Sequence, residues 1–198
     1  IQPMSTLQVP AKLYEMLVFR KPILVITKDG ATADVIKEFD IGFIGDSFTE
    51  AVGVNYKDSF VGRISDGLKN KKIAILGTGA NGSCAAADIT TAGYDVTLID
   101  QWPEHVNAMN INGLTINLPE ETRNTNVNAY HLCNLAELKQ SFDFIFLFVK
   151  AYDTQWITRL IEPYLADDGI LVGVQNAMTA ERISKIVGAD RTIACVVE

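Results

Sequence analysis

The chain has 198 residues, of which 48% are hydrophobic, and it carries a formal net charge of −7. This length allows one large or two small domains with a substantial apolar core. The scattered basic residues and the negative charge argue against nucleic acid or an acidic membrane surface as a partner, since both are negatively charged and bind positively charged surfaces. No apolar run reaches the roughly 18 residues that a membrane span needs, and the first residues do not resemble a signal peptide.

The cysteines and histidines give no indication of a metal site, because they are few and widely spaced. Cys84, Cys133 and Cys195 suit a reducing cytoplasm and predict partly buried thiols instead of disulfides. We expect His105 and His131 to be surface or helix-end residues. The predicted location is therefore cytoplasmic, and no metal is expected.

Residues 1–66 predict a small α/β segment. In chain order the patterns indicate a helix at 11–19, a strand at 21–27, a helix at 31–39 and a strand at 41–46. No glycine-rich turn follows the first strand, so this segment is not expected to contain a dinucleotide site. The stretch ISDGLKN at 64–70 is the candidate boundary, and without a low-complexity linker the two parts are expected to pack together.

The most informative stretch is KKIAILGTGANG at 71–82. A short apolar run leads into Gly-x-Gly-x-x-Gly, a small-residue helix is predicted at 80–92, and a second apolar run, YDVTLID, ends on Asp100. Strand, turn, helix, strand and acid in this order are typical of dinucleotide-binding sites. A glycine-rich turn that binds nothing is the alternative.

Each residue type in this stretch has a physical task. Gly77 allows the tight turn, Gly79 lets the backbone approach a pyrophosphate, and Gly82 lets the helix pack closely on its strand. The unpaired N–H groups at the start of the helix, at Ala80 and Asn81, would then hold the phosphates.

Asp100 indicates which dinucleotide is bound. A carboxylate about 18 residues after the last glycine can accept hydrogen bonds from the adenosine ribose. The same charge would repel a 2′-phosphate, so the sequence favours NAD(H), with NADP(H) as the open alternative.

The elements that follow repeat the alternation of strand and helix. The patterns predict a helix at 103–113, a solvated hairpin formed by GLTINLP (113–119) and TNVNAYHL (125–132), a short helix at 135–141, a buried strand at 142–149, a helix at 154–165, a buried strand at 169–175, a helix at 177–188 and a strand at 192–198. Continuous apolar strands are typical of a parallel sheet that is covered on both faces. Residues 67–198 are therefore predicted to form an α/β domain, a doubly wound, mainly parallel Rossmann-type sheet, preceded by the smaller α/β segment.

Two polar residues follow buried strands, where ligands of open α/β sheets bind. Lys150 ends FDFIFLFV and Asn176 follows GILVGVQ. An ammonium there can attract a carboxylate or carbonyl oxygen, and the amide can bond to a hydroxyl or a nicotinamide ribose. Alternatively, Lys150 only extends to solvent and Asn176 caps the next helix.

The sequence of residues 70–198 resembles that of the N-terminal domain of ketopantoate reductases (2-dehydropantoate 2-reductases). The segments VKAYDT and QNAMTAER carry the resemblance more specifically than the glycines do. It implies that Lys150 and Asn176 are catalytic and lie beside nicotinamide and substrate. It also implies reduction of a small 2-keto acid by hydride transfer from a reduced nicotinamide.

Three departures from that family bear on function. Ala177 stands where glycine is usual, and Asp100 stands where many NADPH-using members have a basic or neutral residue. The family also has a second, helical domain that supplies the general acid. The chain ends before such a domain, so we expect it to turn over inefficiently as it stands. Homo-oligomerisation stays open.

Residues 5–50 are similar to the nucleotide-sugar-binding half of glycosyltransferases with two Rossmann-like domains, which implies a ribose contact for Glu15. A plain amphipathic helix followed by a strand would explain the same residues. Together the two resemblances suggest a fusion or chimera. Beside the oxidoreductase, the alternatives are therefore a non-catalytic dinucleotide-binding or structural α/β module and a nucleotide-sugar transferase fragment.

Overall fold

The computed structural model describes residues 23–27, 43–45, 70–117, 121–175 and 178–197. Its main sheet contains β1 (Ile23–Thr27), β2 (Phe43–Gly45), β3 (Lys72–Leu76), β4 (Asp95–Asp100), β7 (Asn128–His131), β8 (Phe142–Leu147), β9 (Leu165–Val174) and β10 (Thr192–Val197). The helices are α4 (Ala80–Thr91), α5 (Pro103–Asn112), α6 (Thr154–Ile161) and α7 (Ala180–Val187), with 3-10 turns η2 (Leu132–Glu137) and η3 (Glu162–Tyr164). A separate hairpin pairs β5 (Leu114–Asn117) with β6 (Thr122–Thr125).

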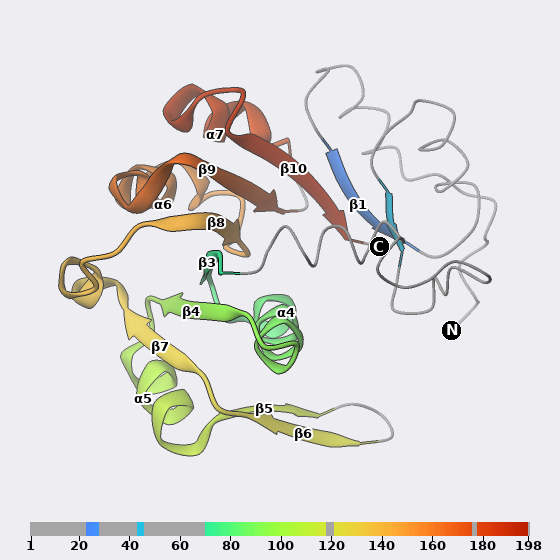
Figure 1. Ribbon diagram of the computed structural model, residues 1–198, viewed down its shortest axis with the longest axis vertical. Coiled ribbons are helices and arrows are strands. Elements are labelled where there is room, and N and C mark those ends of the chain that lie inside the picture. Colours follow the sequence, from blue (N-terminus) through green and yellow to red (C-terminus); the bar gives the residue numbers. More distant parts are fainter. Residues whose placement is uncertain (1–22, 28–42, 46–69, 118–120, 176–177, 198) are drawn as a thin grey trace.

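The strands of the main sheet run in the order β2-β1-β10-β9-β8-β3-β4-β7, and every pair is parallel. The six strands from β3 onward have the order of a doubly wound dinucleotide fold, with the reversal between β3 and β8. The predicted α/β Rossmann-type sheet is therefore confirmed. The strands β1 and β2 extend this sheet beyond β10 (Figure 1).

Two apolar cores lie on opposite faces of the sheet. Alternate residues of β3 point to different faces, so Ile73 and Ile75 join one core while Ala74 and Leu76 join the other. The helices α6 and α7 cover one face, and α4 and α5 cover the other, as Figure 1 shows for α4 opposite α6 and α7. This double coverage explains why β3, β8 and β9 are apolar almost throughout.

The predicted hairpin has a different second strand. β6 consists of Thr122–Thr125, and the second half of TNVNAYHL forms β7 (Asn128–His131), which pairs with β4 in the main sheet. An alternating pattern shows that a strand has one buried face, but it does not show which neighbour supplies the hydrogen bonds. The hairpin prediction was therefore correct in place and wrong in pairing.

Three predicted helices differ in type or length. The short helix expected at 135–141 is the 3-10 turn η2, which starts three residues earlier. α6 ends at Ile161, because Pro163 lacks the N–H group that would continue the helix, and a 3-10 turn follows. α7 starts at Ala180 and ends at Val187, and the C-cap residue Gly188, with a φ of +95°, confirms the predicted stop.

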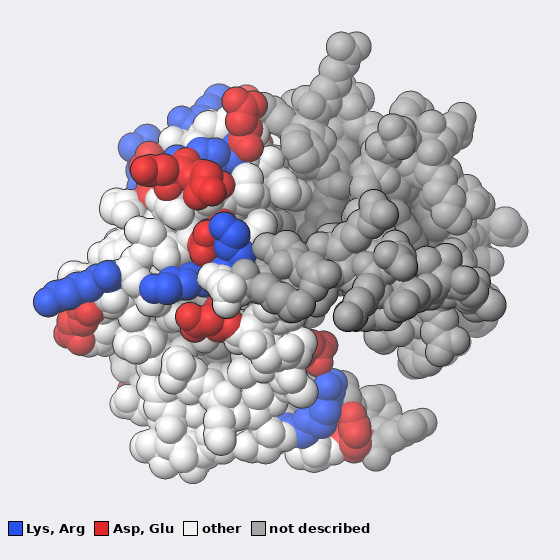
Figure 2. Space-filling view, viewed as in Figure 1, with Lys and Arg blue, Asp and Glu red and all other residues white. Residues whose placement is uncertain are grey.

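Of the elements predicted for residues 1–66, the structure describes the two strands, as β1 and β2. The helices expected at 11–19 and 31–39 and Glu15 lie outside the described residues, so the domain boundary and the glycosyltransferase resemblance stay predictions. In the described part of the chain no helix is long and apolar enough to cross a membrane. Among the described residues on the face shown in Figure 2, acidic and basic side chains are interspersed and do not separate by sign.

Candidate functional site

The glycine-rich turn joins β3 to α4 and touches both neighbouring strands. Gly77 has a φ of +90°, and its N–H donates to Ile99 O on β4 at 2.9 Å. A Cβ at this position would lie 3.1 Å from the backbone of Phe148 and from Val149 Cγ1. Glycine is therefore required at Gly77 by conformation and by space.

The other two glycines of the motif have opposite surroundings. A Cβ at Gly82 would collide with Gly77 O, so only glycine lets α4 approach the turn this closely. A Cβ at Gly79 would meet no atom within 4 Å. Gly79 thus faces open space at the start of α4, where no side chain caps the helix. The first N–H groups of a helix have no partner within it, and those of α4 follow directly after Gly79.

Asp100, at the end of β4, is held by the backbone and side chain of the turn. Its Oδ2 accepts hydrogen bonds from Thr78 N at 2.7 Å and from Thr78 Oγ1 at 2.6 Å. Its Oδ1 accepts one from Trp102 N at 2.9 Å. Burial would raise the pKa of this carboxyl, but the hydrogen bonds from Thr78 and Trp102 outweigh it and hold the pKa below its usual range. Asp100 is therefore ionised at neutral pH.

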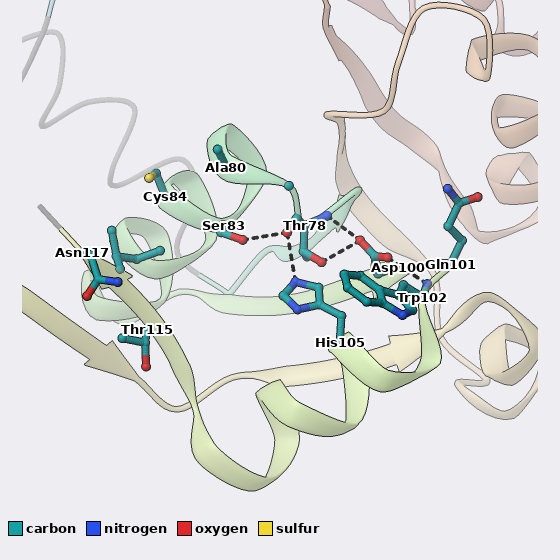
Figure 3. A pocket seen from close by; sticks show the side chains of 12 residues that line it. Thr78, Ala80, Ser83, Cys84, Asp100, Gln101, Trp102, His105, Thr115 and Asn117 are labelled. Atoms are coloured by element: carbon teal, nitrogen blue, oxygen red, sulfur yellow. Dashed lines mark hydrogen bonds between the residues drawn. The ribbon is translucent and has the colours of Figure 1, made fainter.

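Thr78 also receives hydrogen bonds from two helices (Figure 3). Its carbonyl oxygen accepts from Ser83 Oγ on α4 at 2.8 Å and lies 3.0 Å from His105 Nε2 on α5. A carbonyl can only accept, so this histidine carries its hydrogen on Nε2. Thr78 is 3% exposed and links the glycine turn to Asp100 and to both helices.

These residues form one wall of a pocket of about 550 Å³. Trp102, which is 61% exposed, lies beside His105 with ring centroids 5.9 Å apart. Strand β5 closes the opposite wall. The lining residues are Thr78, Gly79, Ala80, Ser83, Cys84, Asp100, Gln101, Trp102, His105, Thr115, Ile116 and Asn117. We call this space the Asp100 pocket.

A second pocket, of about 380 Å³, lies where the strand order reverses. We call it the Lys150 pocket; Lys150, Tyr152 and Gln175 line it from the ends of β8 and β9, and Asn81 lines it from α4. Gln175 is buried, and its amide nitrogen donates to Val149 O at 2.8 Å and to Thr154 Oγ1 at 2.8 Å. Lys150 is exposed, and no ion pair or side-chain hydrogen bond involves it within the described ranges.

The structure brings most of the predicted site residues together. Gly79, Ala80 and Asp100 line one pocket, Asn81 and Lys150 line the other, and Gly77 and Gly82 shape the turn between them. Asn176 and Ala177 lie outside the described residues.

Sequence reasoning missed Thr78, Ser83, Trp102 and His105. Only the position of Thr78, between two glycines, could have pointed to a role in the site.

The expectation of partly buried thiols needs correction, whereas the histidines lie at helix ends as expected. His105 is half-buried in the first turn of α5 and lines the Asp100 pocket, and His131 caps η2. Cys84 and Cys133 are exposed, and only Cys195 is buried; none of the three forms a disulfide. The described residues contain no group of three or more His, Cys, Asp or Glu side chains arranged for a metal ion.

The chain is similar to several 2-dehydropantoate 2-reductases and to a D-mandelate dehydrogenase. It is 35% identical over 110 residues to a 2-dehydropantoate 2-reductase from Lactococcus lactis subsp. lactis, covering 56% of this chain and 35% of that protein. The solved structure of D-mandelate dehydrogenase with NADH and anilino(oxo)acetate superposes with a TM-score of 0.57 at 29% identity, over 62% of this chain and 39% of the other. A PanE/ApbA family ketopantoate reductase from Ralstonia eutropha JMP134 gives a TM-score of 0.54 at 27% identity, over 62% and 39% of the two chains.

The chain thus spans between a third and two fifths of the length of these relatives. Residues 73–198 match the family described as ketopantoate reductase PanE/ApbA. This match covers most of the chain and includes the glycine turn, Asp100 and Lys150. The chain therefore belongs to the ketopantoate reductase family, and the predicted resemblance is confirmed.

Proposed function

We propose that the protein binds NAD(H) along the carboxyl edge of its sheet and takes part in the reduction of a 2-keto acid. One observation carries the proposal: the start of α4 lies between the two pockets. Gly79 and Ala80 line the Asp100 pocket, and Asn81 lines the Lys150 pocket. A dinucleotide with its pyrophosphate at these N–H groups would have its adenosine in the first pocket and its nicotinamide in the second.

The preference for NAD(H) over NADP(H) follows from the charge of Asp100. Its carboxylate lines the adenosine pocket and its lowered pKa keeps it ionised at neutral pH. A 2′-phosphate placed there would face a fixed negative charge in a partly buried site, where repulsion is poorly screened. The relative D-mandelate dehydrogenase was solved with NADH, which supports the same choice.

Lys150 has the properties of a substrate-binding cation. When bound, reduced nicotinamide supplies a hydride to the C2 carbonyl of the acid. The exposed ammonium at the strand reversal can attract the substrate carboxylate or stabilise negative charge on the ketone oxygen. Asn176, the second residue that the family resemblance implies, would contribute an amide beside it.

The reaction also needs a proton for the alkoxide that hydride transfer leaves. A positioned acid typically contributes 10²–10⁴-fold. The Lys150 pocket offers Lys150 and Tyr152 as its titratable groups. We therefore propose that efficient reduction requires the helical domain that the family resemblance implies, and that residues 70–198 alone act as a dinucleotide-binding module. A cytoplasmic location and homo-oligomerisation stay predictions.

A panel of 2-keto acids tests the proposed reaction. The substrates should range from small to branched side chains, with the matching 2-hydroxy acids as controls, and the loss of NADH absorbance should be followed. Oxidation of NADH that depends on a 2-keto acid would support the proposal. Oxidation that is equal with ketones lacking a carboxylate would contradict binding of the substrate carboxylate by Lys150.

A further inference from the structure

The Asp100 carboxylate has little capacity left for a ligand. Each carboxylate oxygen accepts about two hydrogen bonds. Oδ2 already accepts two, both from Thr78, and Oδ1 accepts one, from Trp102 N. One acceptor position remains, and it is on Oδ1. A ribose with two neighbouring hydroxyls could therefore donate only one hydrogen bond to Asp100, from one hydroxyl to Oδ1.

We propose that Thr78 is a positioning residue that fixes this arrangement and thereby sets the discrimination between NAD(H) and NADP(H). The inference rests on the proposed dinucleotide site. Because the backbone N–H and the hydroxyl of Thr78 both hold Oδ2, the carboxylate cannot rotate about its bond to the chain without losing two charge-assisted hydrogen bonds. The negative charge is therefore held in place when a 2′-phosphate approaches.

Thr78 itself is fixed from its other side. Its carbonyl oxygen is bound by Ser83 Oγ from α4 and by His105 Nε2 from α5. Its side chain is buried, with 3% of the residue exposed. A threonine on a flexible turn could follow a moving carboxylate, but this one is held by two helices. The two helices thus fix the position of Thr78, and Thr78 fixes the position of the Asp100 carboxylate.

The test compares Thr78→Val with Thr78→Ser in the full chain. Valine keeps the size and the backbone N–H but removes the hydroxyl, whereas serine keeps the hydroxyl. For each variant the Kd values for NADH and NADPH are measured by fluorescence titration. We expect the preference for NADH to fall by about tenfold in Thr78→Val, since one charge-assisted hydrogen bond is lost. Thr78→Ser should keep the wild-type preference to within about twofold.

The outcomes separate this inference from the proposed function. A wild-type chain that binds neither dinucleotide would refute the proposed site, and the inference with it. A wild-type chain that prefers NADH, with the same preference in Thr78→Val, would overturn the inference alone. A loss in Thr78→Val that Thr78→Ser does not share would support it.

A second measurement does not depend on the valine variant. Thr78→Ala removes the hydroxyl and does not introduce the branched methyl groups of valine. Carbon-13 NMR can follow the Asp100 carboxyl in this variant and in wild type. The Thr78 hydroxyl is one cause of the lowered pKa of Asp100, so that pKa should rise in Thr78→Ala and remain low in Thr78→Ser. An unchanged pKa in Thr78→Ala would show that the hydroxyl does not hold the carboxylate.

Discussion

The two pockets at the carboxyl edge of the sheet differ in how their charged groups are held. In the Asp100 pocket the carboxylate accepts three hydrogen bonds from the chain. In the Lys150 pocket the ammonium is exposed and makes no ion pair or side-chain hydrogen bond with other described residues. A charge that is already fixed can select a ligand by repulsion, whereas a free cation is available to pair with an incoming anion.

This contrast suggests that the Asp100 pocket serves cofactor binding and the Lys150 pocket serves substrate binding in the proposed function. The Asp100 pocket is preorganised by its own chain, as expected of a site that binds the same cofactor in every cycle. In the proposed function the Lys150 pocket supplies a cation that is already in place, and a substrate anion and a proton donor would complete the site. Variants of each pocket should therefore change different quantities.

The largest effect is expected for Lys150→Ala on 2-keto acid reduction. Loss of a cation that stabilises negative charge on the substrate should lower kcat/KM by about 10²-fold in an active preparation. The Kd for NADH should change little, and so should the Tm, because the side chain is exposed.

Lys185→Ala is the matched control for this change. Lys185 lies on α7 in a surface pair with Glu181, and its removal should leave turnover unchanged. Equal turnover in Lys150→Ala and wild type would remove Lys150 from the mechanism.

Gly82→Ala should disrupt the turn between the pockets. The new methyl group would collide with Gly77 O and lie 3.2 Å from Phe148 Cβ, which should cost about 1–3 kcal/mol. A differential scanning calorimetry trace should show a Tm lower by about 3–10 °C, and both dinucleotides should bind more weakly.

Gly79→Ala separates stability from binding at the same turn. Its methyl group meets no atom within 4 Å, so the Tm should be close to that of wild type. Dinucleotide binding should weaken if the pyrophosphate lies there. A normal Kd for NADH in Gly79→Ala would place the pyrophosphate elsewhere.

Asp100→Asn should reduce both stability and discrimination. Removing the charge of a carboxylate that accepts three hydrogen bonds should lower the free energy of unfolding at pH 7 by about 1–3 kcal/mol. The folded-state pKa of Asp100 is lowered, so its stabilisation is complete above the unfolded pKa of about 3.9 and is lost as the pH falls through the folded value. Urea unfolding at several pH values should show the difference between wild type and variant disappearing in acid. A difference independent of pH would contradict the role of the charge.

Asp143→Asn should have the smallest effect and none on ligand binding. Asp143 lies at the amino edge of the sheet, where it accepts from Lys71 Nζ at 2.7 Å and from Lys72 N at 2.8 Å. Burial would raise the pKa of Asp143, but the hydrogen bonds from Lys71 and Lys72 outweigh it and lower the pKa, so this stabilisation is also lost in acid. The pair is partly exposed, so the change in unfolding free energy should be roughly half of that for Asp100→Asn or less. A changed Kd for NADH would show that the two edges of the sheet are coupled.

The fold could be predicted largely because each strand has a strong local signal. Apolar runs such as FDFIFLFV identify buried parallel strands, and Gly188 marks the end of α7. The pairing of β7 could not be predicted, since its alternating pattern fits the edge of either sheet.

The site was predictable where a motif fixes the residue and not where tertiary contacts do. The glycines and Asp100 have characteristic spacings. His105 is 27 residues from Thr78 in sequence, and only the packing of α5 against the turn brings its ring to the carbonyl. Trp102 contributes a backbone N–H to Asp100, which no side-chain pattern reveals.

We propose that the Asp100 pocket binds NAD(H) by its own residues. The most direct test is a fluorescence titration of the purified chain with NADH and NADPH in parallel, at one ionic strength and neutral pH. We predict saturable binding of NADH with a Kd at least about tenfold lower than that of NADPH, which corresponds to about 1.4 kcal/mol. Tighter binding of NADPH, or no saturation with either dinucleotide, would contradict it.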